Sequence, residues 1–105
     1  MTTFNRFALI AAGALLAAVA GPAAAQDPNL ARNLAANCAN CHGTNGKAVP
    51  GAGMEPIAGE PKEKLIRKIK EYRSGVRPAT VMHQISKGYT DEQIDIIAGY
   101  FAAQK

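Results

Sequence analysis

The chain has 105 residues, with 12 Lys and Arg against 8 Asp and Glu, and a formal net charge of +4. It contains no Trp, three Tyr and three Phe, which excludes a large aromatic core. A domain of this size buries a limited core and usually needs a covalent or metal staple. Because no recognised nucleic-acid-binding motif accompanies the basic charge, we expect no nucleic-acid partner.

The N-terminal segment has the pattern of an export signal. Arg6 precedes an apolar run over residues 7–20, and the three alanines at 23–25 offer a small-residue cleavage site. This pattern predicts a secretory signal peptide over residues 1–25, which leaves one domain over residues 26–105. The apolar run is short for a membrane span, and an uncleaved N-terminal anchor is the alternative.

The first helix of the domain is predicted over residues 29–37. Asp27 has the character of an N-cap, and Pro28 suits the first helical position. The helix would deliver the two cysteines of the chain, Cys38 and Cys41, to one site.

The segment Cys38-Ala39-Asn40-Cys41-His42 is the most specific motif in the chain. Cys-x-x-Cys-His is the pattern of c-type haem attachment, in which both thiols bind the porphyrin and the histidine binds the iron. A redox disulfide would require a strand–helix context that the sequence does not show. A Cys2His2 zinc site would have to recruit His83, and the spacing is wrong for it. We therefore predict one covalently bound haem c.

The middle of the domain is predicted to be a loop followed by a helix. Residues 43–59 are rich in Gly, Ala and Pro and are expected to be irregular. Pro61 begins the second helix, which is expected to end near Ser74 with Gly75 as its stop. Leu65, Ile69 and Tyr72 recur at helical spacing and form its apolar side.

The same helix carries a concentration of positive charge. Its basic residues are Lys62, Lys64, Arg67, Lys68, Lys70 and Arg73. With Lys47 and Lys87 they are candidates for steering an acidic redox partner. The alternative is a solvated helix surface without a binding role.

The C-terminal part is predicted to be a short helical turn and a longer helix. The turn covers residues 83–87, and Thr90 with Gln93 forms a capping box for the last helix. Its apolar side consists of Ile94, Ile97, Ala98 and Phe101. Gly99 weakens a helix by about 1 kcal/mol relative to Ala, so we expect it to allow close approach of another backbone, that of the first helix.

The second axial ligand of the iron has three candidates. Met54, Met82 and His83 all follow the attachment motif. Spacing favours Met82, because it lies in an irregular stretch that can pass over the opposite face of the haem. A thioether ligand fills the coordination shell and suits electron transfer. If Met82 did not bind, an open iron site would instead indicate an enzyme or a gas sensor.

Taken together, these segments resemble class I c-type cytochromes. The resemblance rests on residues 37–46, on Ile57-Ala58-Gly59, on residues 72–75 and on the C-terminal helix. Residues 81–89 with 98–101 resemble, more particularly, the haem domains of the cytochrome subunit of flavocytochrome c sulfide dehydrogenase and related dihaem cytochromes. The resemblance implies a small all-α fold, with three to four short helices around one covalently bound haem.

The resemblance also implies roles for individual residues. It makes Met82 the distal ligand, and it implies that a proline carbonyl holds the other ring nitrogen of His42. Pro50 is the candidate for that carbonyl, with Pro56 as the alternative. It further implies that the N- and C-terminal helices cross, and that the protein is periplasmic.

The function expected from these features is single-electron transfer by a periplasmic monohaem cytochrome with no catalytic site of its own. The alternative is a tightly bound electron-accepting subunit of a flavoprotein dehydrogenase, such as sulfide dehydrogenase. The expected partners are redox proteins, either such a dehydrogenase or a terminal oxidase. No stable membrane span is expected in residues 26–105.

Overall fold

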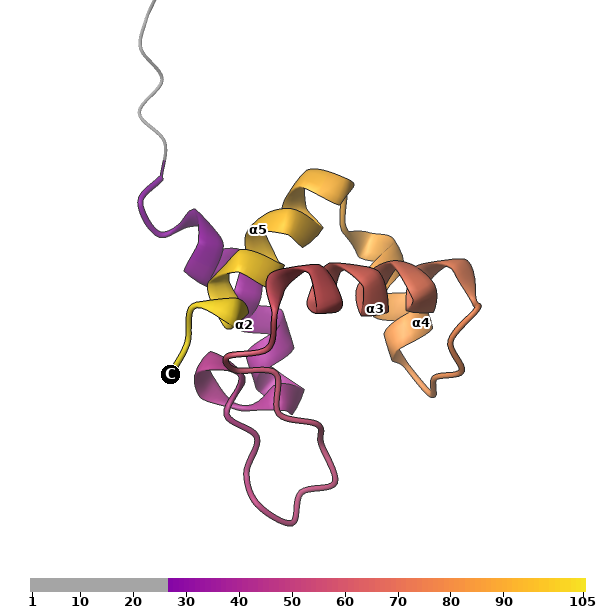
Figure 1. Cartoon of the computed structure of the whole chain (residues 1–105), viewed down its shortest axis with the longest axis horizontal. Coiled ribbons are helices and arrows are strands. Elements are labelled where there is room, and N and C mark those ends of the chain that lie inside the picture. Colours follow the sequence, from indigo (N-terminus) through magenta and orange to yellow (C-terminus); the bar gives the residue numbers. More distant parts are fainter. Residues whose placement is uncertain (1–26) are drawn as a thin grey trace, which may run out of the picture.

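The computed structural model describes residues 27–105, so the predicted signal peptide lies outside the described residues. Within these residues four α-helices follow one another: α2 (Leu30–His42), α3 (Lys62–Ser74), α4 (Met82–Ile85) and α5 (Asp91–Ala102). Two short 3-10 helices, η1 (Thr44–Gly46) and η2 (Ser86–Gly88), follow α2 and α4. Figure 1 shows the arrangement, which contains no strand within residues 27–105 and confirms the all-α prediction.

Helix α2 is longer than predicted and contains the whole attachment motif. It runs through Cys38 and Cys41 to His42, and Gly43 follows it with φ of 86°. Its start also differs from the prediction. Asn29 occupies the N-cap position, whereas the Asp27 carboxylate accepts a 2.8 Å hydrogen bond from the Asn29 backbone N–H in the turn before the helix.

The bounds of α3 and α5 follow the sequence signals closely. Gly75 ends α3 in the left-handed conformation, with φ of 83°, as expected of a C-terminal glycine. At the start of α5, the Thr90 side chain accepts from the Gln93 N–H at 3.1 Å, and the Gln93 side chain accepts from the Thr90 N–H at 2.9 Å. The predicted capping box is therefore confirmed.

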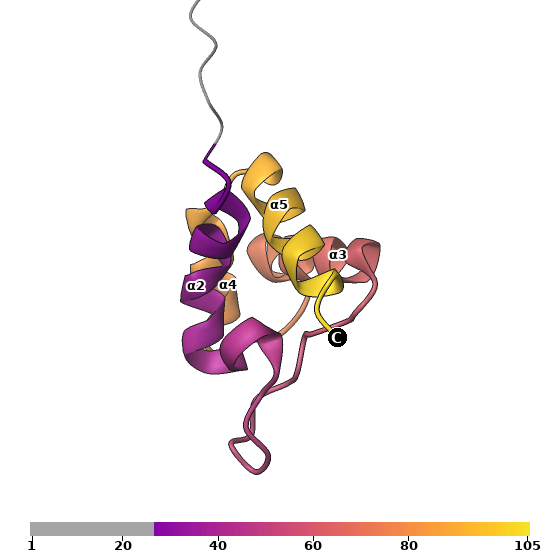
Figure 2. The ribbon, with the colours of Figure 1, turned by 90° about the vertical axis from the view of Figure 1, so that its left-hand side faces the viewer.

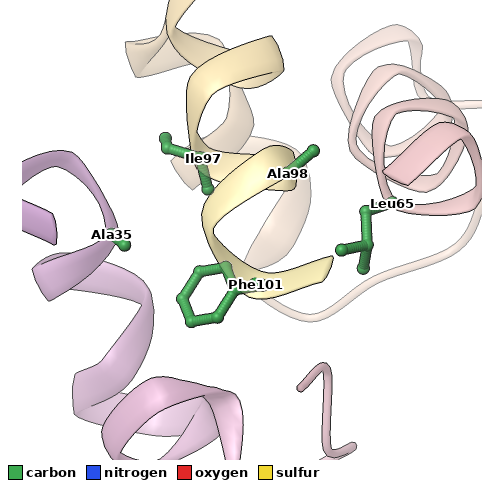
Figure 3. Packing of buried hydrophobic residues seen from close by; sticks show 5 residues of the cluster. All are labelled: Ala35, Leu65, Ile97, Ala98 and Phe101. Atoms are coloured by element: carbon green, nitrogen blue, oxygen red, sulfur yellow. The ribbon is translucent and has the colours of Figure 1, made fainter. Parts of the chain in front are cut away.

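The core lies where α5 packs between α2 and α3 (Figure 2). Its buried residues are Ala35 from α2, Leu65 from α3, and Ile97, Ala98 and Phe101 from α5 (Figure 3). The predicted apolar side of α5 is thus the side that is buried. Burial of Leu65, Ile97 and Phe101 stabilises the domain by about 1.5–3 kcal/mol for each side chain.

Gly99 does not have the role predicted for it. A Cβ at this position would come nearest to the Lys62 side chain, at 3.7 Å from Cε, which is ordinary van der Waals distance. The space beside Gly99 faces the first residue of α3, and the backbone of α2 does not approach it closely. The reason is rotational position: Ile97, Ala98 and Phe101 already occupy the buried side of α5.

The segment between η1 and α3, residues 47–61, extends away from the helices (Figure 1). Gly46, the last residue of η1, is buried with φ of 78°, and its carbonyl accepts hydrogen bonds from the N–H groups of Ile57 at 2.9 Å and Ala58 at 3.1 Å. The Gly59 N–H donates to the Phe101 carbonyl at 2.9 Å. Both ends of the loop are therefore fastened to the helical part of the molecule.

Candidate functional site

A cavity opens among α2, the 47–61 loop, α3, α4 and α5. Seventeen residues line it, from these segments and from the stretch just before α4, and most of the lining is apolar. Leu65, Ile69 and Tyr72 contribute the predicted apolar side of α3, and Phe101 forms part of the inner wall. An apolar cavity of this kind suits a large flat cofactor with few polar groups.

Cys38, Cys41 and His42 all line this cavity from the last two turns of α2. Because the two cysteines are three residues apart on a helix, they lie on the same side of it. The two cysteines form no disulfide with each other, and Cys41 is exposed whereas Cys38 is partly buried. Burial raises the pKa of the Cys38 thiol, against the lowering effect of its backbone hydrogen bond. The motif therefore presents two thiols and one imidazole to a single space.

The ring of His42 is held by a backbone carbonyl. Its Nδ1 lies 2.7 Å from the carbonyl oxygen of Glu55, which requires the proton on Nδ1 and leaves Nε2 as the nitrogen available to a metal. The prediction placed the carbonyl of Pro50 at this nitrogen, with Pro56 as the alternative. In the structure Pro50 lies in the exposed outer part of the loop, and it does not line the cavity. The loop returns to His42 at Glu55, the residue before Pro56.

Two of the three candidates for the second axial position line the cavity. Met82 is the first residue of α4, and Met54 lies in the 47–61 loop. His83 does not line the cavity, and its Nδ1 is buried without a hydrogen-bond partner among the described residues. Met82 and Ile85 face the cavity three residues apart, so His83 is turned to another side of the same helical turn.

The family of the chain follows from its sequence. Residues 30–104 match the family model for cytochrome c, a stretch that includes all the helices described above. The chain belongs to the cytochrome c family. With its all-α fold and its attachment motif near the N-terminus of the domain, it is a class I c-type cytochrome, a family whose members bind haem c covalently.

Several curated cytochromes are similar to it. The cytochrome subunit of sulfide dehydrogenase from Chlorobaculum tepidum is 38% identical over 68 residues, which are 65% of this chain and 60% of that protein. Cytochrome c4 from Pseudomonas aeruginosa is 32% identical over 90 residues, 86% of this chain and 42% of that protein. Cytochrome c-554(548) from Halomonas halodenitrificans is 34% identical over 93 residues, 82% of this chain and all of that protein.

This cytochrome thus spans about 40–60% of the first two of these relatives, and the whole length of the third. Within residues 27–105, no helix is long and apolar enough to cross a membrane.

The residues of the cavity fit a haem. Its lining is mainly apolar, its wall carries the two thiols in the attachment spacing, and the one imidazole on it has its Nδ1 engaged by a carbonyl. Met54 and Met82 provide thioether sulfurs of the kind that binds haem iron. The donor set therefore agrees with the cofactor of the family.

Two residues of the site were missed at the sequence level. Glu55 holds His42 through its backbone, and Lys68 of α3 lines the cavity and contacts the Glu55 carboxylate at 2.5 Å. The hydrogen bond from Lys68 lowers the pKa of Glu55. A backbone acceptor can be any residue type, and residues 55 and 68 share no periodic pattern, so no sequence signal marked this pair.

The positive charge of α3 is locally compensated. Each of its six basic residues lies within 4 Å of a carboxylate of this cytochrome, in pairs such as Lys62–Asp95 at 3.0 Å and Lys64–Glu60 at 2.7 Å. Lys47 and Lys87 have no such partner within residues 27–105. The run of basic residues seen in the sequence is therefore mostly a set of ion pairs.

Proposed function

We propose that this cytochrome is a periplasmic monohaem electron carrier, exported by residues 1–25, whose iron is ligated by His42 and Met82. The observation that carries the proposal is the 2.7 Å contact between His42 Nδ1 and the Glu55 carbonyl, in a cavity that is also lined by the two thiols and two methionines. Haem c, when bound, supplies a one-electron couple at its iron.

The residues of the chain would each have a defined task. Cys38 and Cys41 would hold the cofactor covalently from one side of α2. The Glu55 carbonyl fixes the orientation of the His42 ring and increases the basicity of its Nε2, because a hydrogen bond at one ring nitrogen strengthens the other as a donor. Leu65 and Phe101 exclude water from the inner part of the cavity.

Met82 is favoured over Met54 by the way each is held. Met82 begins α4, and its carbonyl accepts a 2.6 Å hydrogen bond from the Ser86 hydroxyl, which is almost completely buried. Met54 lies in the irregular loop with 45% of its surface exposed. A ligand that must stay bound in both oxidation states is better supplied by the fixed element.

The experiment compares three forms of the purified protein by absorption spectroscopy. Wild type and the control variant Met54→Ala should show haem bands and should not bind carbon monoxide when reduced. Met82→Ala should bind it, because the sixth position is then open. Ready binding by the wild type would contradict a carrier with both axial positions filled. Binding by Met54→Ala and not by Met82→Ala would transfer the role to Met54.

The second candidate is an electron-accepting subunit of a flavoprotein dehydrogenase. Met54, Val81 and Ile85 line the cavity and are also exposed at its opening, which is the kind of apolar surface that a stable partner covers. The similarity to the sulfide dehydrogenase subunit supports the same candidate. Native purification from the host through a C-terminal tag distinguishes the two. Haem bands together with flavin bands indicate the subunit, and haem bands alone indicate the free carrier.

For a free carrier, electrostatic steering would depend more on cations without an ion-pair partner in residues 27–105, such as Lys47 and Lys87, than on those of α3. The charges of α3 contribute less to a long-range field, because each has a carboxylate beside it.

A further inference from the structure

We propose that the ion pair between Lys68 and Glu55 is a positioning device for His42, holding the Glu55 peptide so that its carbonyl keeps accepting the His42 Nδ1–H. The inference rests on the proposed function in taking His42 as the iron ligand. Lys68 and the Glu55 side chain are positioning groups in this scheme, and neither is required to touch the iron.

Glu55 is held from both of its ends. Its carbonyl oxygen lies 2.7 Å from His42 Nδ1, and its carboxylate lies 2.5 Å from Lys68 Nζ. One residue therefore connects the end of α2 with the middle of α3. If the carboxylate is fixed to α3, the peptide group of the same residue has less freedom to move away from the imidazole.

The two partners differ in how firmly they are placed. The Lys68 side chain is 16% exposed and lines the cavity from a thirteen-residue helix, whereas the Glu55 side chain is 52% exposed on a loop. The helix is thus the fixed partner and the loop residue is the one that is held. A positioning role for the ion pair requires that Lys68 be fixed and that Glu55 be held by it.

The loop before Glu55 offers few other restraints. Residues 49–56 are all exposed, and Gly51 and Gly53 have nothing within 4 Å of a Cβ position. Within residues 48–56, the backbone hydrogen bond from Ala52 N–H to the Val49 carbonyl closes a local turn and does not reach the helices. The next fixed point after Glu55 is Ile57, which donates to Gly46.

Pro56 supplies part of the restraint but not all of it. A residue before proline is confined to extended backbone conformations, which limits ψ of Glu55. Its φ can still vary by about 40° in either direction, and rotation about this bond would swing the side chain away from Lys68 while the carbonyl turns from His42. The ion pair opposes that rotation.

The test measures hydrogen exchange of the His42 Nδ1–H by NMR in the reduced, haem-loaded full chain. Lys68→Met and Glu55→Gln should each speed this exchange about two- to fivefold, as expected from losing a partly exposed ion pair. The Glu55→Lys/Lys68→Glu double variant, which reverses the pair without changing net charge, should restore the wild-type rate. Backbone amides of α5 should exchange at unchanged rates in all variants.

Lys64→Met is the matched control. It removes the same charge from the same helix and breaks a 2.7 Å ion pair with Glu60, and it should leave the His42 exchange rate unchanged. The proposal is overturned if Lys68→Met and Glu55→Gln leave the rate at the wild-type value, if Lys64→Met speeds it equally, or if Lys68→Met alone has an effect. That last result would mean that Lys68 acts on the cofactor without Glu55. Haem absorption bands test the proposed function separately, because they are present or absent whatever the exchange rate.

Discussion

Gly46 is a buried position at which the structure predicts a large effect of a single added methyl group. Its φ of 78° is in the left-handed region, which costs an L-residue about 1–2 kcal/mol. A Cβ would also lie 2.8 Å from Ile57 Cγ1, 2.8 Å from Phe101 Cδ1 and 2.9 Å from the Ala58 nitrogen. These neighbours belong to the core and to a hydrogen-bonded backbone, so they cannot simply move aside.

Gly46→Ala should therefore carry two penalties. The conformational cost is about 1–2 kcal/mol, and overpacking of a filled site adds about 1–3 kcal/mol. Gly75→Ala is the matched control, because Gly75 has φ of 83° but nothing within 4 Å of its Cβ position. The control should show the conformational cost alone.

The assay is urea unfolding of the haem-loaded protein, followed by absorption and by circular dichroism. Gly46→Ala should lower the free energy of unfolding by about 1–3 kcal/mol more than Gly75→Ala does. Since the Gly46 carbonyl anchors the returning loop, the variant should also weaken the hold on Glu55. Equal losses of unfolding free energy in the two variants would refute the reasoning, because the close contacts at Gly46 would then add no cost.

Two further predictions concern α5. Gly99→Ala should raise the free energy of unfolding by up to about 1 kcal/mol in the same urea assay, because Ala favours a helix more than Gly does. The added Cβ would have only ordinary van der Waals contacts. A loss of stability would show that the site is tighter than the structure indicates. Asp91→Asn should make the free energy of unfolding depend less on pH in the acidic range. The hydrogen bond from Arg73, reinforced by Lys70, lowers the pKa of Asp91, so its stabilisation is present above the unfolded-state pKa and is lost as the pH falls through the native pKa. Glu63→Gln is the control, because Glu63 has no ion pair within residues 27–105. Urea unfolding at a series of acidic pH values measures the effect. If the free energy of unfolding had the same slope against pH in both variants, the stabilisation would not come from Asp91.

Local signals predicted α3 and α5 closely, and they predicted that Cys38, Cys41 and His42 face one space. The capping box at Thr90, the glycine stop at Gly75 and the apolar side of α5 act through near neighbours in the chain, and the structure has each of them as predicted. The end of α2 was underestimated, because Cys and His have modest helix propensities and yet the backbone hydrogen bonds continue to His42.

Contacts between distant segments were beyond the reach of sequence patterns. The acceptor for His42 is a carbonyl at the end of a loop of glycines and prolines, and the path of such a loop is not encoded by periodicity. The basic run of α3 was visible, but its neutralisation depends on acidic residues up to 33 positions away, as in Lys62–Asp95. The reason for Gly99 was likewise assigned to the wrong neighbour, because the rotational position of α5 was unknown.

The compensated charge of α3 has a consequence for how such cytochromes can be recombined. Its cations reach carboxylates on other segments, at Glu55, Glu60, Asp91 and Asp95. A chimera that received residues 62–74 from a relative would leave these four acidic groups facing a foreign set of side chains. The helix and its four counter-charges form one transferable unit, and we expect them to vary together among homologous sequences.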